Sequence, residues 1–197
     1  MSRVLVPGSA SILVALALSL CVLAGCVPVI VAGAVGGAAM VATDRRSAGA
    51  QVDDESIELK ITTRANSEFG ERIHLNVTSY NGYVLLTGEV PDKGALTSVG
   101  ILAKNTEKVR GVHNEMVIGP NSDLSARSND TYITSKVKTR MIEANKFPPN
   151  VVKVVTERGV VYLMGIVSKQ EGDAATEAAA TTAGVVRVVK FFQYSPA

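Results

Sequence analysis

The stretch DESIELKITTR at residues 54–64 returns as DTYITSKVKTR at residues 130–140, so the chain contains one short pattern twice. Glycines continue the match farther along the chain: Gly82 and Gly88 align with Gly159 and Gly165 after a one-residue slip, and Gly111 aligns with Gly184 after a further slip. Repetition over this length predicts two copies of one structural unit.

Each copy opens with the apolar spacing of a helix. The spacing i, i+4, i+8 is filled by Ile57, Ile61 and Ala65 in the first copy, and by Ile133, Val137 and Met141 in the second. This spacing places the three side chains on one face of a helix. Asp54 and Asp130 are predicted to be the N-caps, because a short carboxylate can accept hydrogen bonds from the first free amides.

A β-hairpin is predicted next in both copies. In residues 73–78 apolar and polar side chains alternate, Asn81-Gly82 is typical of a tight turn, and apolar residues resume at Val84. The second copy has Glu157-Arg158-Gly159 between two apolar runs, which predicts the same hairpin one residue shorter. A second helix, at 92–108 and 169–183, and a last strand after Gly111 and Gly184 complete each copy.

The predicted fold class is therefore α+β, with two α-β-β-α-β modules. Each module should hold a three-stranded mixed sheet covered by two helices. The predicted domains are residues 54–118 and 130–194, joined by a polar, turn-rich linker at 119–129. Because a core of about 65 residues is marginal alone, the two modules are expected to pack together.

The first residues have the pattern of a lipoprotein signal peptide. A single cation, Arg3, precedes the apolar stretch 9–24, which runs into Leu23-Ala24-Gly25-Cys26. This is a lipobox, and it predicts a signal peptide at 1–25 and lipidation of Cys26. The alternative is an ordinary signal or anchor helix that happens to contain cysteine. Residues 26–53 are expected to form a lipidated apolar tether and linker; the alternative places the apolar part in the folded region.

Lipidation of Cys26 would supply an N-acyl diacylglycerol, with fatty acids such as palmitate, as the one covalent group, and no cofactor is expected. Cys21 would leave with the signal peptide, so no disulfide is expected. Several acyl chains together would hold the protein firmly on a membrane. Val27 stands where aspartate would favour retention at the inner membrane, which favours the periplasmic face of the outer membrane.

The chain has a lipobox followed by two repeats, and the second repeat contains the stretches SNDTYITSKVKTR at 128–140 and YLMGIV at 162–167. In these features it resembles the dual BON-domain outer-membrane lipoproteins of Gram-negative bacteria, the DolP group. The resemblance covers residues 26–194. It implies a non-enzymatic protein of the cell envelope that binds anionic phospholipid through the first helix of its second module. It also implies concentration at division sites and support of outer-membrane integrity. The family carries an aromatic residue at the position of Tyr132; one member has tryptophan there, and tyrosine buries less apolar area.

The charges of the two opening helices agree with this implication. The first copy has a balance of −2 over its helix, whereas the second has +2. Cations near an anionic leaflet contribute about 1 kcal/mol each, so the second helix is the better membrane surface. The predicted phospholipid-binding residues are Tyr132, Lys136, Lys138, Arg140 and Ile142. The alternative is a solvated helix face with an incidental tyrosine.

Other functions find little support in the sequence. His74 and His113 have no metal-ligand partners at recognisable spacing and are interpreted as strand-edge or surface residues, so no metal site is expected. No catalytic motif is found, and an enzyme is not expected. A net charge of +2 is far from that of a nucleic-acid-binding protein. The remaining alternative is an envelope or outer-membrane assembly factor that docks partners on sheet edges such as VVRVVKFFQY at 185–194.

Overall fold

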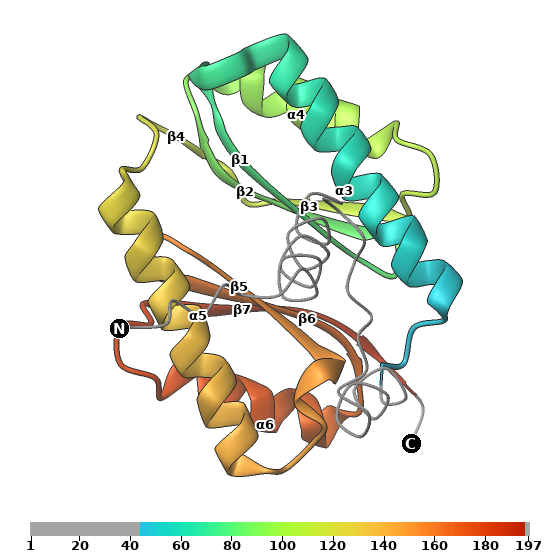
Figure 1. Ribbon diagram of the computed structural model, residues 1–197, viewed down its shortest axis with the longest axis vertical. Coiled ribbons are helices and arrows are strands. Elements are labelled where there is room, and N and C mark those ends of the chain that lie inside the picture. Colours follow the sequence, from blue (N-terminus) through green and yellow to red (C-terminus); the bar gives the residue numbers. More distant parts are fainter. Residues whose placement is uncertain (1–43, 196–197) are drawn as a thin grey trace, which may run out of the picture. The chain divides into compact units, whose positions relative to one another are not determined.

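The structure, a computed structural model, describes residues 44–195. The first module consists of α3 (Ala48–Phe69), the 3-10 turn η1 (Gly70–Arg72), β1 (His74–Tyr80), β2 (Tyr83–Val90), α4 (Lys93–Lys104), β3 (Gly111–Asn114) and β4 (Val117–Ile118) (Figure 1). The second consists of α5 (Leu124–Ala144), η2 (Pro149–Val151), β5 (Val152–Glu157), β6 (Val160–Val167), α6 (Lys169–Ala180) and β7 (Arg187–Tyr194).

Both opening helices begin about two turns earlier than predicted. Ser47 caps α3 by accepting from the amide of Ala50, and Asp123 caps α5 by accepting from the amide of Ala126. Residues 124–129, predicted as linker, are therefore helical. These turns have little apolar periodicity, and they extend a helix whose later turns are fixed by packing. The predicted N-cap role of Asp54 and Asp130 is wrong.

The two aspartates instead hold the hairpin turns from inside the helices. Asp54 is 2% exposed, and its carboxylate accepts from the amides of Asn81 and Gly82 at 2.7 and 2.8 Å. Asp130 accepts from the amides of Arg158 and Gly159, both at 2.8 Å.

In each turn both central residues have positive φ, which is the geometry of a two-residue hairpin turn. The turn of the second module thus has the same length as the turn of the first. The buried carboxylate is what fixes the turn to its helix in each module.

Each sheet has the predicted mixed topology. In the first sheet β1 and β2 are antiparallel, and β3 runs parallel to β2 on its other side. The second sheet has the order β5-β6-β7 with the same directions. The last strand of the first module is interrupted at Glu115-Met116, because Met116 turns into the core with 5% exposure. The chain then pairs again with β2 as the short β4.

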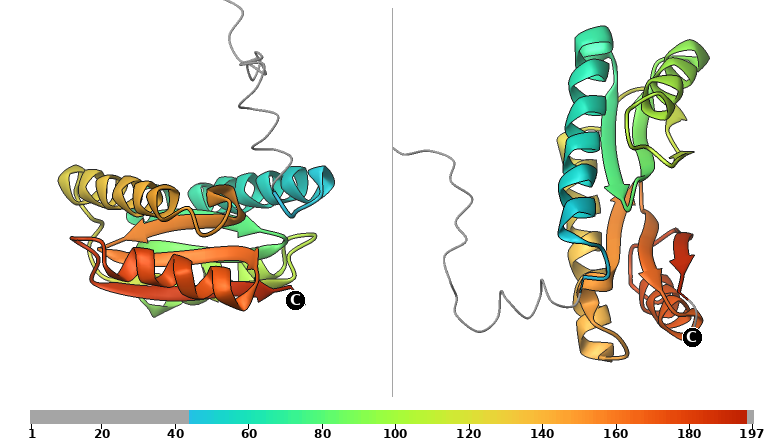
Figure 2. Two further views of the ribbon diagram at one scale, coloured as in Figure 1. Left: turned by 90° about the horizontal axis from the view of Figure 1, so that it is seen from below. Right: turned by 90° about the vertical axis from the view of Figure 1, so that its right-hand side faces the viewer.

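Two helices cover one face of each sheet (Figures 1 and 2). In the first module Ile57, Ile61 and Ala65 of α3 pack with Val84 and Leu86 of β2 and with α4. In the second module α5 and α6 pack on the matching face of β5 and β6. The predicted helix faces are therefore the buried ones.

The other faces of the two sheets contact each other. Tyr80 and Leu85 of the first sheet form one buried cluster with Tyr162 and Met164 of the second. Hydrogen bonds and ion pairs surround this cluster. They join Asn81 to Gln193 at 2.7 Å, Lys153 to Glu58 at 2.9 Å, and Arg45 to Glu171 through two contacts of 2.7 Å. The expected packing of the modules is confirmed.

Gly88 and Gly165 occupy the same place in the two sheets, opposite Leu75 and Val152. A Cβ atom at Gly88 would lie 2.0 Å from the carbonyl oxygen of His74, and one at Gly165 would lie 2.4 Å from that of Val151. The strands can approach this closely only without a side chain at either glycine.

Gly165→Ala should therefore destabilise the second module by about 1–3 kcal/mol, because the added methyl group must displace main-chain atoms. Urea unfolding followed by circular dichroism measures the effect. Gly119→Ala is the matched control, since a Cβ atom there would have no neighbour within 4 Å. Equal unfolding midpoints for the two variants would show that the close approach at Gly165 contributes nothing.

Candidate functional site

The predicted lipid-binding residues lie on α5, whose opposite face is buried in the second module. Ile133, Val137 and Met141 are at most 2% exposed and anchor the helix on its sheet. With 3.6 residues per turn, the side chains farthest from this buried face are Tyr132, Ser135, Thr139 and Ile142. Tyr132 is 63% exposed and Ile142 is 59% exposed. We call these four residues the outer stripe of α5.

Cations flank the outer stripe on both sides, but they differ in their contacts. On one side Lys136 donates from Nζ to the carbonyl of Ala183, and Arg140 donates to the carbonyl of Thr181. Thr181 is the C-cap of α6, so these two cations complete the carbonyl end of that helix. On the other side Lys138 is exposed and has no ion-pair partner within residues 44–195.

Two grooves border the stripe. Tyr132, Lys136 and Arg140 line a groove of about 500 Å³ together with Thr182 and Ala183 of the loop after α6. The Lys136 ammonium lies 5.0 Å from the centre of the Tyr132 ring, within cation–π range. Lys138 and Ile142 border a second groove of about 350 Å³. The structure thus brings all five predicted residues to the exposed side of one helix, on two neighbouring grooves.

The equivalent helix of the first module also exposes apolar side chains, but its charge is opposite. Val52 and Leu59 of α3 are 66% and 68% exposed. Over its whole length α3 carries five carboxylates and two cations, whereas α5 carries four cations and two carboxylates. The feature that separates the two helices is therefore positive charge around exposed apolar residues.

Cys26 and the predicted signal peptide and tether lie outside the described residues. Within residues 44–195, no helix has both the length and the apolar character that crossing a bilayer requires.

The aromatic residues of the predicted docking strand β7 are mostly used inside the protein. Phe191 stacks on His113 of the first module with 3.9 Å between ring centres, and Phe192 packs against the core of the second module. Tyr194 is 52% exposed. His113 is thus part of the contact between the modules, and its burial lowers the pKa of its imidazole.

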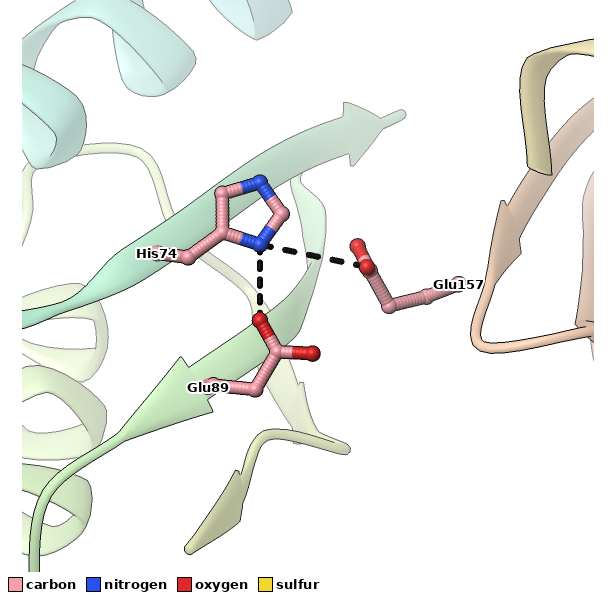
Figure 3. Close-up of side chains that lie close together, drawn as sticks. All are labelled: His74, Glu89 and Glu157. Carbon is pink, nitrogen blue, oxygen red and sulfur yellow. Dashed lines mark hydrogen bonds and ion pairs between the residues drawn. The ribbon is translucent and has the colours of Figure 1, made fainter. Parts of the chain in front are cut away.

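The second histidine belongs to a polar cluster that sequence spacing could not reveal. His74 of β1 pairs across the sheet with Glu89 of β2, and Glu157 reaches them from β5 of the other module (Figure 3). His74 Nδ1 lies 2.8 Å from Glu89 Oε2 and 3.9 Å from Glu157 Oε1. Glu89 is 0% and Glu157 5% exposed. His74 and Glu89 are neighbours in one hairpin, whereas Glu157 is distant in the chain and reaches them only through the contact between the sheets.

The two carboxyl groups of this cluster have different acidities. Burial raises the pKa of Glu157 above its ordinary value, although Asn76 donates a hydrogen bond to it. Burial also disfavours the ionised form of Glu89, but hydrogen bonds with His74 and with the amide and hydroxyl of Ser122 outweigh it and lower its pKa. Glu89 is therefore the carboxylate of the pair that is more readily ionised.

Comparison with known proteins agrees with the repeat and the fold. The BON domain family matches residues 53–120 and 129–196. The chain is 36% identical over 174 residues to the outer membrane lipoprotein DolP of Haemophilus influenzae, covering 87% of this chain and 90% of that protein. It is 37% identical over 153 residues to a 21 kDa hemolysin of Actinobacillus pleuropneumoniae, covering 77% and 79%.

A solved structure of CdsD, a structural protein of the type III secretion system of Chlamydia trachomatis, covers 72% of this chain and 93% of its own. Its TM-score is 0.30 at 12% identity. The BON family match and the DolP relative each span most of the two modules. The chain therefore belongs to the BON domain family, as a DolP-like lipoprotein with two BON domains.

Proposed function

We propose that this protein is anchored by lipidated Cys26 to the periplasmic face of the outer membrane, where its second BON domain binds anionic phospholipid through α5. In this proposal it acts without catalysis, supports the integrity of the cell envelope and concentrates at division sites. The observation that carries the proposal is the outer stripe of α5, where exposed Tyr132 and Ile142 lie among cations. The name of the DolP relative supports the outer-membrane location.

The outer stripe suits a helix that lies flat on a bilayer. Tyr132 and Ile142 are ten residues apart, so they are separated by about 15 Å along the helix axis. Both can enter the headgroup region only if the axis is roughly parallel to the membrane. A tyrosine ring is stable at this depth because its body is apolar and its hydroxyl remains hydrated. Lys136 and Lys138 on either side would then face lipid phosphates.

Flotation with liposomes tests the proposal, using residues 44–197, which contain every described helix and strand. The parent should float with vesicles that contain phosphatidylglycerol and stay unbound with pure phosphatidylcholine. Tyr132→Glu should reduce binding at least about tenfold, because it removes an interfacial aromatic ring and adds a charge repelled by the bilayer. Leu59→Glu on α3 is the matched control, since Leu59 is equally exposed.

A Tyr132→Glu variant that folds normally and floats like the parent would exclude α5 as the lipid-binding surface. Docking of partner proteins on the sheet edges would then be the better explanation. Equal losses in Tyr132→Glu and Leu59→Glu would instead show that a negative charge added at any exposed site is enough to weaken vesicle binding.

Lys138→Gln isolates the contribution of charge. Because Lys138 has no ion-pair partner among residues 44–195, its replacement should leave the free energy of unfolding unchanged. Binding to anionic vesicles should weaken by about fivefold at low salt, and the difference should shrink at 0.5 M salt, where charges are screened beyond a few ångströms. Lys136→Gln should weaken binding and should also lower the free energy of unfolding, because the carbonyl of Ala183 loses its hydrogen bond from Lys136. A loss in Lys138→Gln that is independent of salt would contradict an electrostatic role.

A further inference from the structure

The cluster of His74, Glu89 and Glu157 places two buried carboxyl groups beside the apolar centre of the contact between the sheets. Around it the sheets meet through Tyr80, Leu85, Tyr162 and Met164. Removing a carboxylate from water costs several kcal/mol unless a cation or hydrogen bonds compensate for it. Such residues in a contact between sheets therefore require a compensating partner.

The internal repeat shows that the fold itself does not require these residues. The strand register gives Val151, Ile166 and Tyr80 as the equivalents of His74, Glu89 and Glu157 in the other copy. There the Tyr80 hydroxyl donates to the carbonyl of Val151 at 3.4 Å, and neither side chain beside it is charged. In one half of the contact these three positions thus hold uncharged side chains, with the Arg46 guanidinium 4.3 Å from the centre of the Tyr80 ring. In the other half they hold two carboxyl groups and an imidazole.

The geometry of the cluster is close to that of a metal site. One nitrogen of His74 and one oxygen from each glutamate all lie within 4.8 Å of one another. Atoms bound to one tetrahedral Zn²⁺ at about 2.0–2.2 Å lie about 3.4 Å apart. The distances of 2.8 Å and 3.9 Å from His74 Nδ1 lie on either side of this value. Shifts of well under 1 Å would bring these two pairs of atoms to it.

A second observation points to a missing ligand. Glu89 is fully buried, yet its Oε1 accepts no hydrogen bond from the described part of the chain. This oxygen forms an ion pair with the Arg158 guanidinium at 3.6 Å, which is too long for a hydrogen bond, and the Arg158 side chain is 55% exposed. A buried carboxylate oxygen is expected to have a closer partner. Arg158 can turn to solvent without leaving a buried donor behind.

We propose that His74 Nδ1 and the carboxylates of Glu89 and Glu157 bind one Zn²⁺ ion that joins the two BON domains. One imidazole and two carboxylates are a ligand set that zinc accepts, and the ion offsets both buried negative charges. Water or the Ser122 hydroxyl, which lies 3.2 Å from Glu89 Oε2, completes four ligands. A cavity of about 360 Å³, lined in part by His74 and Glu157, gives the ion access. Because Glu157 comes from the second domain, zinc fixes the first domain to it.

Zinc titration of the full chain tests this proposal. The protein is purified in detergent without a polyhistidine tag, stripped of metal with a chelator, and titrated with Zn²⁺ by calorimetry. We expect one saturable site and a thermal unfolding midpoint that rises with zinc concentration, because the ion binds the folded state. Co²⁺ should bind with the intense visible bands of a tetrahedral site.

Glu157→Gln is the central variant, since the amide keeps the size of the side chain and can still accept from Asn76. It should lose zinc affinity at least about tenfold, because even the loss of a supporting partner of a metal ligand costs this much. Glu177→Gln is the control, because Glu177 is exposed and pairs with Lys146 on the surface. If Glu157→Gln does not fold, His74→Gln takes its place.

Absence of saturable binding in the parent at up to about 0.1 mM Zn²⁺ would overturn the proposal. So would equal affinities in the parent, Glu157→Gln and His74→Gln, because zinc would then bind elsewhere on the chain. The outcome is independent of lipid binding, since none of the three residues belongs to α5.

Discussion

Cys26→Ser is expected to abolish fatty-acid labelling of the protein in cells and to leave an uncleaved precursor. The thiol of Cys26 is the one group of the lipobox that can take the diacylglycerol, and processing follows that modification. Metabolic labelling with a palmitate analogue, followed by fractionation of the membranes, measures the effect. The loss should be complete, because serine has no thiol to acylate.

Cys21→Ser is the matched control, because Cys21 lies in the predicted signal peptide and would be absent from the mature protein. This variant should be labelled and processed like the parent. Labelling that persists in Cys26→Ser would contradict the lipoprotein assignment of that residue. Loss of labelling in both variants would indicate that export itself had failed.

Asp54→Ala should cost about 3–5 kcal/mol, which is close to the whole stability of a small domain. Besides the amides of Asn81 and Gly82, its carboxylate accepts from the hydroxyl of Ser79 at 2.6 Å and from Arg46 at 2.8 Å. Removing it leaves buried amides without acceptors and a part-buried guanidinium without one of its partners. The first module should unfold at a much lower urea concentration than in the parent.

Asp53→Ala is the control for Asp54→Ala. Asp53 pairs with Lys108 on the surface, and such exposed pairs contribute little to stability. Asp130→Ala should fall between the two variants, because Asp130 accepts from two backbone amides and has no arginine partner among residues 44–195. Similar unfolding midpoints for Asp54→Ala and Asp53→Ala would show that the buried carboxylate does not hold the turn.

The contribution of Asp54 should also depend on pH. Burial raises the pKa of this carboxyl, but the hydrogen bonds from Ser79, Gly82, Arg46 and Asn81 together lower it below its ordinary value. A carboxyl whose pKa is lower in the folded state stabilises the fold above its unfolded pKa. This stabilisation is lost as the pH falls through the folded pKa. Asp54→Ala should therefore differ most from the parent at neutral pH and least in strong acid.

The sequence determined the local structure and the repeat. The spacing of Ile57 and Ile61, the alternation in β1 and the glycines of the turns depend on residues that are close in the chain. The structure confirms the helix face, the strand and the turns that they predict. The equivalence of Gly88 and Gly165 could be predicted because the equivalent strands of two copies of one fold approach their neighbouring strands equally closely. The predicted lipid-binding residues are also close in the chain, because all five lie on the single helix α5.

Tertiary structure decided everything that depends on residues distant in the chain. Asp54 and Asp130 look like N-caps when only their own helices are considered, but a folded hairpin offers them better-placed amides. Glu157 meets His74 only because the uncovered faces of two sheets bury each other, and no spacing in the chain encodes that distance. The charge of a helix can be counted from the sequence. Only packing shows that Lys136 and Arg140 bind carbonyls just after α6 and that Lys138 has no ion-pair partner among residues 44–195.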